Sequence, residues 1–356
     1  MSYLVLARKY RPQTFEDVVE QAHVTRTLTN AIRAGRVAHA ILFSGPRGTG
    51  KTTIARILAK AMNCENGPTP TPCNECTSCR EITGGSAVDV FEIDGASNNG
   101  VDHIRDLREN VKYMPAHSRY KIYIIDEVHM LSTPAFNALL KTLEEPPGHI
   151  LFFFATTEPR KIPITILSRC QQHHLRRIRP DDVARHMAAL CEKEGVAMPP
   201  ESLALIARET GGSMRDALSL LDQVMTCTDG EITYDGVLGI LGVADREVLF
   251  RVTESIFGGN IPEILEIIDD IYHRGHDLKA FYGALMAHFR NLWIVRMVPD
   301  PARIIDLPAG EIERMATLVR NASELYLSQL MDAFAREEPA VRFSSQPRLA
   351  LEMAFI

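Results

Sequence analysis

Several protein classes are disfavoured by what this sequence does not contain. It has no uninterrupted apolar run of about 18 residues, so no segment resembles a membrane-spanning helix. The early apolar run at residues 3–7 has positive charges after it rather than before it, unlike a secretory signal. Basic residues are not in excess, since 39 Lys and Arg face 45 Asp and Glu, for a net charge of −6. Any nucleic-acid surface is therefore expected to be local.

The cysteine content does not fit a simple disulfide framework. There are seven cysteines, an odd number, and four of them are clustered. Without a secretory signal, this pattern predicts reduced thiols in a cytoplasmic protein. A length of 356 residues is ample for a sizeable core and suggests two or three domains.

Residues 45–52 read Gly-Pro-Arg-Gly-Thr-Gly-Lys-Thr, the pattern of a phosphate-binding P-loop. A short apolar run at 40–43 predicts a buried strand before it, and helical spacing of apolar residues predicts a helix from about Lys51. Glycines let backbone N–H groups face the phosphates, and the helix N-terminus adds positive charge. Lys51 would reach the terminal phosphates and the Thr52 hydroxyl a Mg²⁺ ion. The alternative is a glycine-rich turn without a ligand, for which a chance match is on the order of one in a hundred.

Four cysteines follow the P-loop helix with the spacing C-x8-C-x2-C-x2-C. They are Cys64, Cys73, Cys76 and Cys79. Four thiolates can close a tetrahedral zinc site and leave no open position, which predicts a structural site. The iron–sulfur alternative would place a fourth Cys at position 83, where the sequence has Thr83. Unligated thiols are the remaining alternative.

An acidic pair follows the apolar run 121–125. Asp126 and Glu127 come at the predicted carboxyl end of a buried strand, about 75 residues after the P-loop. Asp126 could hold Mg²⁺ through its water shell, and Glu127 could orient or deprotonate the attacking water. A further apolar strand at 150–155 leads to Thr157, whose hydroxyl could touch the γ-phosphate or the water; an ordinary β-branched strand end is the alternative.

Two arginines are candidates for functional roles rather than ordinary surface positions. Arg169, in Ser-Arg-Cys, could be an arginine finger supplied in trans to a neighbouring site, or an ordinary surface residue. Arg215 lies in the first turn of a predicted helix, where Ser213 and Asp216 form a capping box and the dipole mildly disfavours a cation. That local cost suggests a second role, with a tolerated surface arginine as the alternative.

These features together resemble the tau/gamma family, the AAA+ motor subunits of bacterial DNA polymerase III clamp loaders. The similarity is dense over residues 1–180 and thinner beyond 245. The matching stretches are Lys9-Tyr10-Arg11-Pro12, the P-loop, the four cysteines, 125–131, 137–147, Ala155-Thr156-Thr157 and Ser168-Arg169-Cys170. The resemblance implies an ATP and Mg²⁺ site that includes Lys51, Thr52, Asp126, Glu127, Thr157, Arg169 in trans, Arg215, Arg11, Val19, Gly45, Gly48, Thr49, Gly50 and Thr53. One departure is Glu20, where the family usually has glycine before Gln21.

The resemblance also implies an architecture and a set of partners. It predicts an α/β AAA+ domain with a parallel sheet at 1–179, a zinc module at 64–79, a helical lid at 180–242 and an all-α oligomerisation collar at 243–356. Expected partners are the delta and delta-prime subunits, other copies of the chain, the beta sliding clamp, primed DNA, and the polymerase core through a tail found in the long family form. No membrane partner is expected.

Two other functions remain open at this stage. One is a different ring motor on DNA, such as a branch-migration helicase, although no hairpin-rich segment follows residue 243. The other is a scaffold that binds ATP without hydrolysing it. Contacts to DNA are expected to follow the backbone, with Arg105 as a weak candidate.

Overall fold

A computed structural model of the chain describes residues 4–100, 107–227, 232–241, 246–305, 307 and 309–356. The chain packs as two compact units, residues 1–232 and 233–356. The predicted boundary between ATPase domain and lid, at 179/180, falls inside the first unit, and the boundary at 242/243 falls outside the described residues.

The first unit is built on a parallel five-stranded sheet in the order β2-β3-β4-β1-β5. The register places Ile41 opposite Phe153 and Ile125 opposite Phe154. Because all five strands are parallel, their carboxyl ends lie at one edge, where α/β sheets hold ligands. The strands are β1 (Ala40–Ser44), β2 (Val90–Asp94), β3 (Lys121–Asp126), β4 (Ile150–Thr156) and β5 (Gln171–His174).

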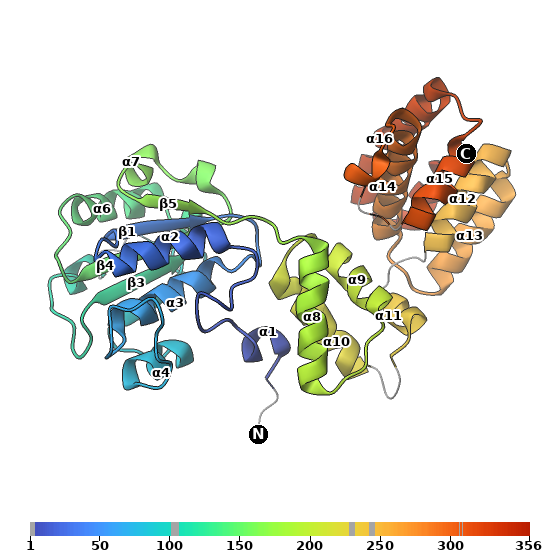
Figure 1. The fold of residues 1–356 in the computed structure, drawn as a ribbon. Helices are drawn as coiled ribbons and strands as arrows, with labels where there is room; N and C mark the ends of the chain where they lie inside the picture. Colours follow the sequence, from blue (N-terminus) through green and yellow to red (C-terminus); the bar gives the residue numbers. More distant parts are fainter. Residues whose placement is uncertain (1–3, 101–106, 228–231, 242–245, 306, 308) are drawn as a thin grey trace. The chain divides into compact units, whose positions relative to one another are not determined.

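Both faces of the sheet are covered, which explains why its central strands are apolar throughout. Side chains of β1 alternate between two cores: Ile41 and Phe43 pack on one face, Ala40 and Leu42 on the other. The first core includes residues of α2 (Ala22–Arg33) and α3 (Lys51–Asn63); the second includes residues of α6 (Thr133–Glu144) and α7 (Ile164–Leu167). Figure 1 shows this layered arrangement around the sheet.

Helix α3 begins at Lys51, where the sequence predicts it, and the ends of two other helices carry clear local signals. α2 ends at Arg33, before Gly35, and α6 begins after Ser132, whose side chain caps the helix by accepting from the Ala135 N–H. Helix α4 (Thr77–Gly84) carries the last of the four clustered cysteines.

The helices α8, α9 and α10, which we call the lid, follow the sheet within the first unit. α8 packs on α9, and α10 packs on both. The short helix α1, from the start of the chain, packs on α10 rather than on the sheet. Their bounds are α1 (Leu6–Lys9), α8 (Pro180–Glu194), α9 (Pro200–Glu209) and α10 (Met214–Cys227).

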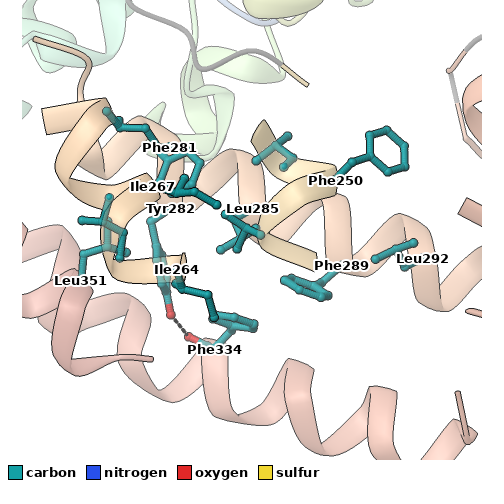
Figure 2. Close-up of a cluster of buried hydrophobic side chains, with 14 of the residues drawn as sticks. Phe250, Ile264, Ile267, Phe281, Tyr282, Leu285, Phe289, Leu292, Phe334 and Leu351 are labelled. Carbon is teal, nitrogen blue, oxygen red and sulfur yellow. Dashed lines mark hydrogen bonds between the residues drawn. The ribbon is translucent and has the colours of Figure 1, made fainter. Parts of the chain in front are cut away.

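The regular elements in the described residues of the second unit are all helices. Its core combines aliphatic and aromatic side chains: Phe289 stacks on Phe334, and the Tyr282 hydroxyl donates to the Phe334 carbonyl oxygen at 2.7 Å (Figure 2). None of the described helices of the chain has the length and apolar character that crossing a bilayer requires. The elements are α11 (Tyr234–Leu241), α12 (Arg246–Gly258), α13 (Ile261–His273), α14 (Leu278–Met297), α15 (Ala309–Val319), α16 (Glu324–Phe343) and α17 (Pro347–Met353).

Candidate nucleotide and metal sites

The P-loop connects the carboxyl end of β1 to the start of α3. Gly50 precedes the helix with a φ of 101°, and Gly48 has a φ of 73°, both in the left-handed region that favours glycine. Gly45 is also required by packing, since a Cβ there would lie 2.5 Å from the backbone oxygen of Leu175. The loop is therefore shaped by its backbone and by close neighbours on the sheet.

Lys51 points back into this loop and is 6% exposed. Its Nζ donates to the carbonyl oxygens of Gly45 at 3.0 Å and Pro46 at 2.8 Å. Burial lowers the pKa of Lys51, and Glu127 and Asp126 act in the opposite direction. A buried ammonium bonded only to neutral carbonyls fits an anionic phosphate as an additional partner. The Thr49 hydroxyl stabilises the loop by donating to the Pro46 carbonyl oxygen at 2.9 Å.

Thr52 and Asp126 are brought together from α3 and β3. The Thr52 hydroxyl donates to Asp126 Oδ2 at 2.6 Å. A hydroxyl and a carboxylate are the oxygen groups that hold Mg²⁺ beside a P-loop, so this pair fits the ion. Thr53 lies beside it in the first turn of α3.

Glu127 and Thr157 also meet. Glu127 has a φ of 43°, and its Oε2 accepts from the Thr157 N–H at 3.2 Å and from the Thr157 hydroxyl at 3.0 Å. His129, whose side chain is 6% exposed, places Nδ1 3.4 Å from the same Glu127 oxygen and 3.0 Å from the Thr156 hydroxyl. The carboxylate next to the predicted Mg²⁺ ligand is therefore held by a strand-end threonine.

The lid touches the P-loop directly. The Arg215 backbone N–H donates to the Gly48 oxygen at 3.4 Å. Half of the predicted capping box is present: the Ser213 hydroxyl accepts from the Asp216 N–H at 3.3 Å and donates to Asp216 Oδ2 at 2.7 Å, while the Ser213 N–H donates to the Thr210 carbonyl oxygen instead of Asp216. Asp216 also faces Arg47 of the P-loop at 3.6 Å. The start of α10 is thus in position to respond to the phosphate loop.

The N-terminal loop, residues 11–21, approaches the same region. Burial lowers the pKa of the half-buried Arg11, and the nearby Arg56 and Arg215 lower it further, whereas Glu92, which pairs with Arg56 at 2.7 Å, acts in the opposite direction. The loop is fixed by Gln21, which is fully buried and exchanges two hydrogen bonds with the Arg176 backbone, at 2.8 and 3.0 Å.

Two other residues of the loop explain its local shape. Val19 is half-buried near the end of the loop. Glu20 adopts a φ of 58°, the left-handed region in which a glycine has no steric penalty. The family's usual glycine at this position thus matches the backbone conformation that Glu20 adopts here.

Arg169 does not join this cluster. Its guanidinium donates to Glu144 at 2.6 Å and to the Thr165 carbonyl at 2.7 Å, and it is one-third exposed. These partners lie on α6 and α7, away from the phosphate loop in the sequence.

The four clustered cysteines converge. One ligand atom from each lies within 4.8 Å of the others, with Cys64 and Cys73 Sγ 3.6 Å apart and Cys73 and Cys79 Sγ 4.0 Å apart. Tetrahedral zinc–sulfur bonds require an Sγ–Sγ separation of about 3.8 Å. The Cys76 N–H donates to Cys73 Sγ at 3.3 Å and lowers the pKa of Cys73 to about 6. The residues present therefore fit a structural zinc ion.

Sequence reasoning missed several contacts in these sites. No sequence pattern for catalysis or metal binding contains His129, Gln21 or the buried Lys60. One feature of the sequence could have identified Lys60 as a buried charge: it is a lysine on a helix whose other residues are mostly apolar. Arg105, the candidate DNA contact, lies outside the described residues.

Family models match most of the chain in three segments. The model described as DNA polymerase III, delta subunit, matches residues 20–179. The clamp-loader ATPase lid domain matches 182–230, and domain III of DNA polymerase III subunits gamma and tau matches 232–356.

Curated relatives extend over the whole chain. The DNA polymerase III subunit tau of Bacillus subtilis is 43% identical over all of this chain and 63% of its own length. The DNA polymerase III subunit gamma of Buchnera aphidicola is 35% identical over all of this chain and 96% of its own length. The chain thus spans less than two thirds of the Bacillus relative.

A solved structure supports the fold alone. A variant of RuvB from Thermotoga maritima superposes with a TM-score of 0.51 at 17% identity, covering 90% of this chain and 91% of that one. Together with the parallel sheet, the P-loop and the four-cysteine cluster, the sequence relationships place the chain: it belongs to the gamma/tau family of DNA polymerase III clamp-loader subunits, which are AAA+ ATPases.

Proposed function

We propose that this chain binds and hydrolyses ATP as the motor subunit of a DNA polymerase III clamp loader, and that it loads the sliding clamp onto primed DNA. The observation that carries the proposal is the convergence of Lys51, Thr52, Asp126 and Glu127 at the end of the sheet. Hydrolysis of a phosphoanhydride by such a site depends on positioning and charge neutralisation rather than covalent chemistry.

Each residue has a role in the proposed reaction. Bound Mg²⁺ would supply charge neutralisation across the β- and γ-phosphates. Thr52 and Asp126 would hold that ion, while Lys51 and the N–H groups of residues 45–50 bind the phosphates. Glu127 would orient the attacking water, and Thr157 would hold the Glu127 carboxylate in position. Arg11 and Val19 would contact the nucleotide from the N-terminal loop, with Thr49 and Thr53 supporting the phosphate end.

Two arginines would couple the site to its surroundings. Arg169 would complete the site of a neighbouring subunit, which makes ATP part of the subunit interface. Arg215 would report the presence of the γ-phosphate to the lid, since its own backbone already contacts Gly48. ATP binding would then favour the assembled state that opens the clamp, and hydrolysis would release it.

The proposed partners follow from the family and not from surfaces on this chain. They are the delta and delta-prime subunits, further copies of this chain, the beta clamp and primed DNA, with the polymerase core reached through a further segment of the longer relatives. The proposed cofactors are ATP with Mg²⁺, and one structural Zn²⁺ at the four cysteines.

Steady-state ATP turnover of the chain mixed with delta-type partners tests the proposal. Turnover is measured with and without clamp plus primed DNA, and with Lys51→Ala as the control. Strong stimulation by clamp and primer together is the expected result. Turnover indifferent to both would indicate another DNA motor, and none at all a non-hydrolysing scaffold.

A further inference from the structure

A buried lysine joins the cysteine cluster to the N-terminal loop. Lys60, on α3, is 2% exposed, and its Nζ donates to Gln13 Oε1 at 2.6 Å and to Asn74 Oδ1 at 2.7 Å. A buried ammonium needs its hydrogen-bond acceptors, because leaving it unpaired is costly. Gln13 Oε1 and Asn74 Oδ1 are therefore both held next to the Lys60 ammonium group.

One of these amides belongs to the zinc module. Asn74 lies between Cys73 and Cys76 and has a φ of 62°, a conformation that asparagine tolerates better than most residues. Because thiolates on either side of Asn74 would bind one ion, a bound zinc would fix the backbone that presents Asn74 to Lys60.

The other amide belongs to the N-terminal loop. Gln13 Oε1 accepts a second hydrogen bond from Thr83 of α4 at 3.2 Å, and Gln13 Nε2 donates to the Arg11 carbonyl at 2.8 Å. The loop is closed on itself by Asp17, which accepts from the Thr14 N–H at 2.9 Å and from the Thr14 hydroxyl at 2.8 Å. Gln13 is thus the point at which a preformed loop is attached to the cysteine-bearing segment.

We propose that the zinc module acts as a positioning element for nucleotide binding: through Asn74, Lys60 and Gln13 it holds the N-terminal loop, and with it Arg11, in the geometry that receives the adenosine part of ATP. This rests on the proposed ATP site. It gives the cysteine cluster a role in the affinity for nucleotide, whereas the phosphate-binding residues 45–52 do not depend on the linkage.

The test compares two ligands on the full chain. Calorimetry measures the affinity for ATP, which uses the loop and the phosphate site, and for inorganic tripolyphosphate, which uses the phosphate site alone. The variants are Gln13→Ala and Asn74→Gly; the second keeps a residue that accepts the left-handed backbone and removes only the amide. Matched controls are Gln223→Ala, an exposed glutamine on the lid, and Asn66→Gly, an exposed asparagine within the zinc module.

Both variants should bind ATP up to about tenfold more weakly, because ATP must then order a loop that has lost one hydrogen bond to a charged group, and they should bind tripolyphosphate as the parent does. Their zinc content should stay at one ion per chain, since neither residue is a ligand. Removing zinc from the parent with a chelator should reproduce the selective loss for ATP.

Three results would overturn the linkage: unchanged ATP affinity in both variants, an equal loss for both ligands, or a chelated parent that binds ATP like the zinc form. Failure of the ATP site itself gives a different pattern. In that case the parent binds no ATP, or Lys51→Ala binds it as well as the parent.

Discussion

Ser213 of the lid lies against Gly48 of the P-loop so closely that a Cβ on Gly48 would be 1.8 Å from the Ser213 hydroxyl oxygen. The glycine therefore serves two demands at once. Its φ of 73° shapes the phosphate loop, and its missing side chain leaves room for the lid.

Replacing Gly48 with alanine should disturb both the shape of the phosphate loop and the packing of the lid against it. We expect Gly48→Ala to lower the free energy of unfolding by about 1–3 kcal/mol, through left-handed strain and the clash with Ser213, and to weaken ATP binding. Adding Ser213→Gly should recover part of the stability, because the clash is removed while the strain remains. Chemical denaturation in a double-mutant cycle measures this coupling, and strictly additive effects would contradict the contact.

Asp126→Asn should separate nucleotide binding from turnover. The amide keeps the shape that accepts the Thr52 hydroxyl at 2.6 Å but loses the charge that attracts Mg²⁺. We expect ATP to bind in the absence of Mg²⁺ as it does to the parent, with turnover reduced by at least about a hundredfold. Calorimetry with and without Mg²⁺, next to an ATPase assay, checks this. Equal Mg²⁺ dependence in variant and parent would argue against Asp126 as a ligand.

Arg169→Ala should leave the chain's own nucleotide affinity unchanged and abolish turnover in the assembled complex. The reason is that its guanidinium faces Glu144 and Thr165 rather than the P-loop. Mixing experiments locate the defect: a variant with an intact P-loop but no Arg169 should impair the neighbour's site and not its own. Weaker ATP binding by the isolated variant would count against the role in trans.

Asp89 should make the free energy of unfolding of the first unit depend on pH in the acidic range. Burial alone would raise the pKa of this carboxyl, but N–H groups of residues 116–118 at 2.7–2.9 Å reverse the effect and lower it. A lowered folded-state pKa means that the stabilisation is present above the unfolded value of about 4 and is lost as the pH falls through the folded value.

Asp89→Asn should therefore cost about 1–3 kcal/mol at neutral pH and less in acid. Thermal unfolding from pH 7 down to pH 3 compares the two proteins. The gap in Tm should narrow as the pH falls, and a constant gap would show that the carboxylate charge is not the source.

Local patterns in the sequence identified most of the residues that the structure brings together in the candidate sites. The P-loop, Asp126 and the four cysteines were readable because each depends on spacing within a few residues of one element, and the sheet then carries the acid pair to the loop. The start of α3 at Lys51 and the cap at Ser213 were predicted for the same reason.

Contacts between distant segments were not readable. Gln21 bonds Arg176 across 155 positions, and Lys60 joins Gln13 to Asn74, yet nothing in the local sequence marks these partners. The position of Ser213 over Gly48 depends equally on how the lid packs. The domain boundaries and the roles of all the candidate site residues, Arg169 and Arg215 included, stay predictions.

The first residues of the chain bear on how the lid can move. Leu6 donates its backbone N–H to Asp222, and Lys9 and Tyr10 both bond Glu194, so residues 4–10 are fastened to the lid helices before the chain enters the N-terminal loop. The chain returns to the lid at residues 175–180. Two separate segments of backbone therefore join the lid to the sheet, residues 11–21 on one side and 175–179 on the other. Because a rotation of the lid must keep both connections intact, we expect removal of residues 4–10 to leave one connection and to widen the range of rotations open to the lid.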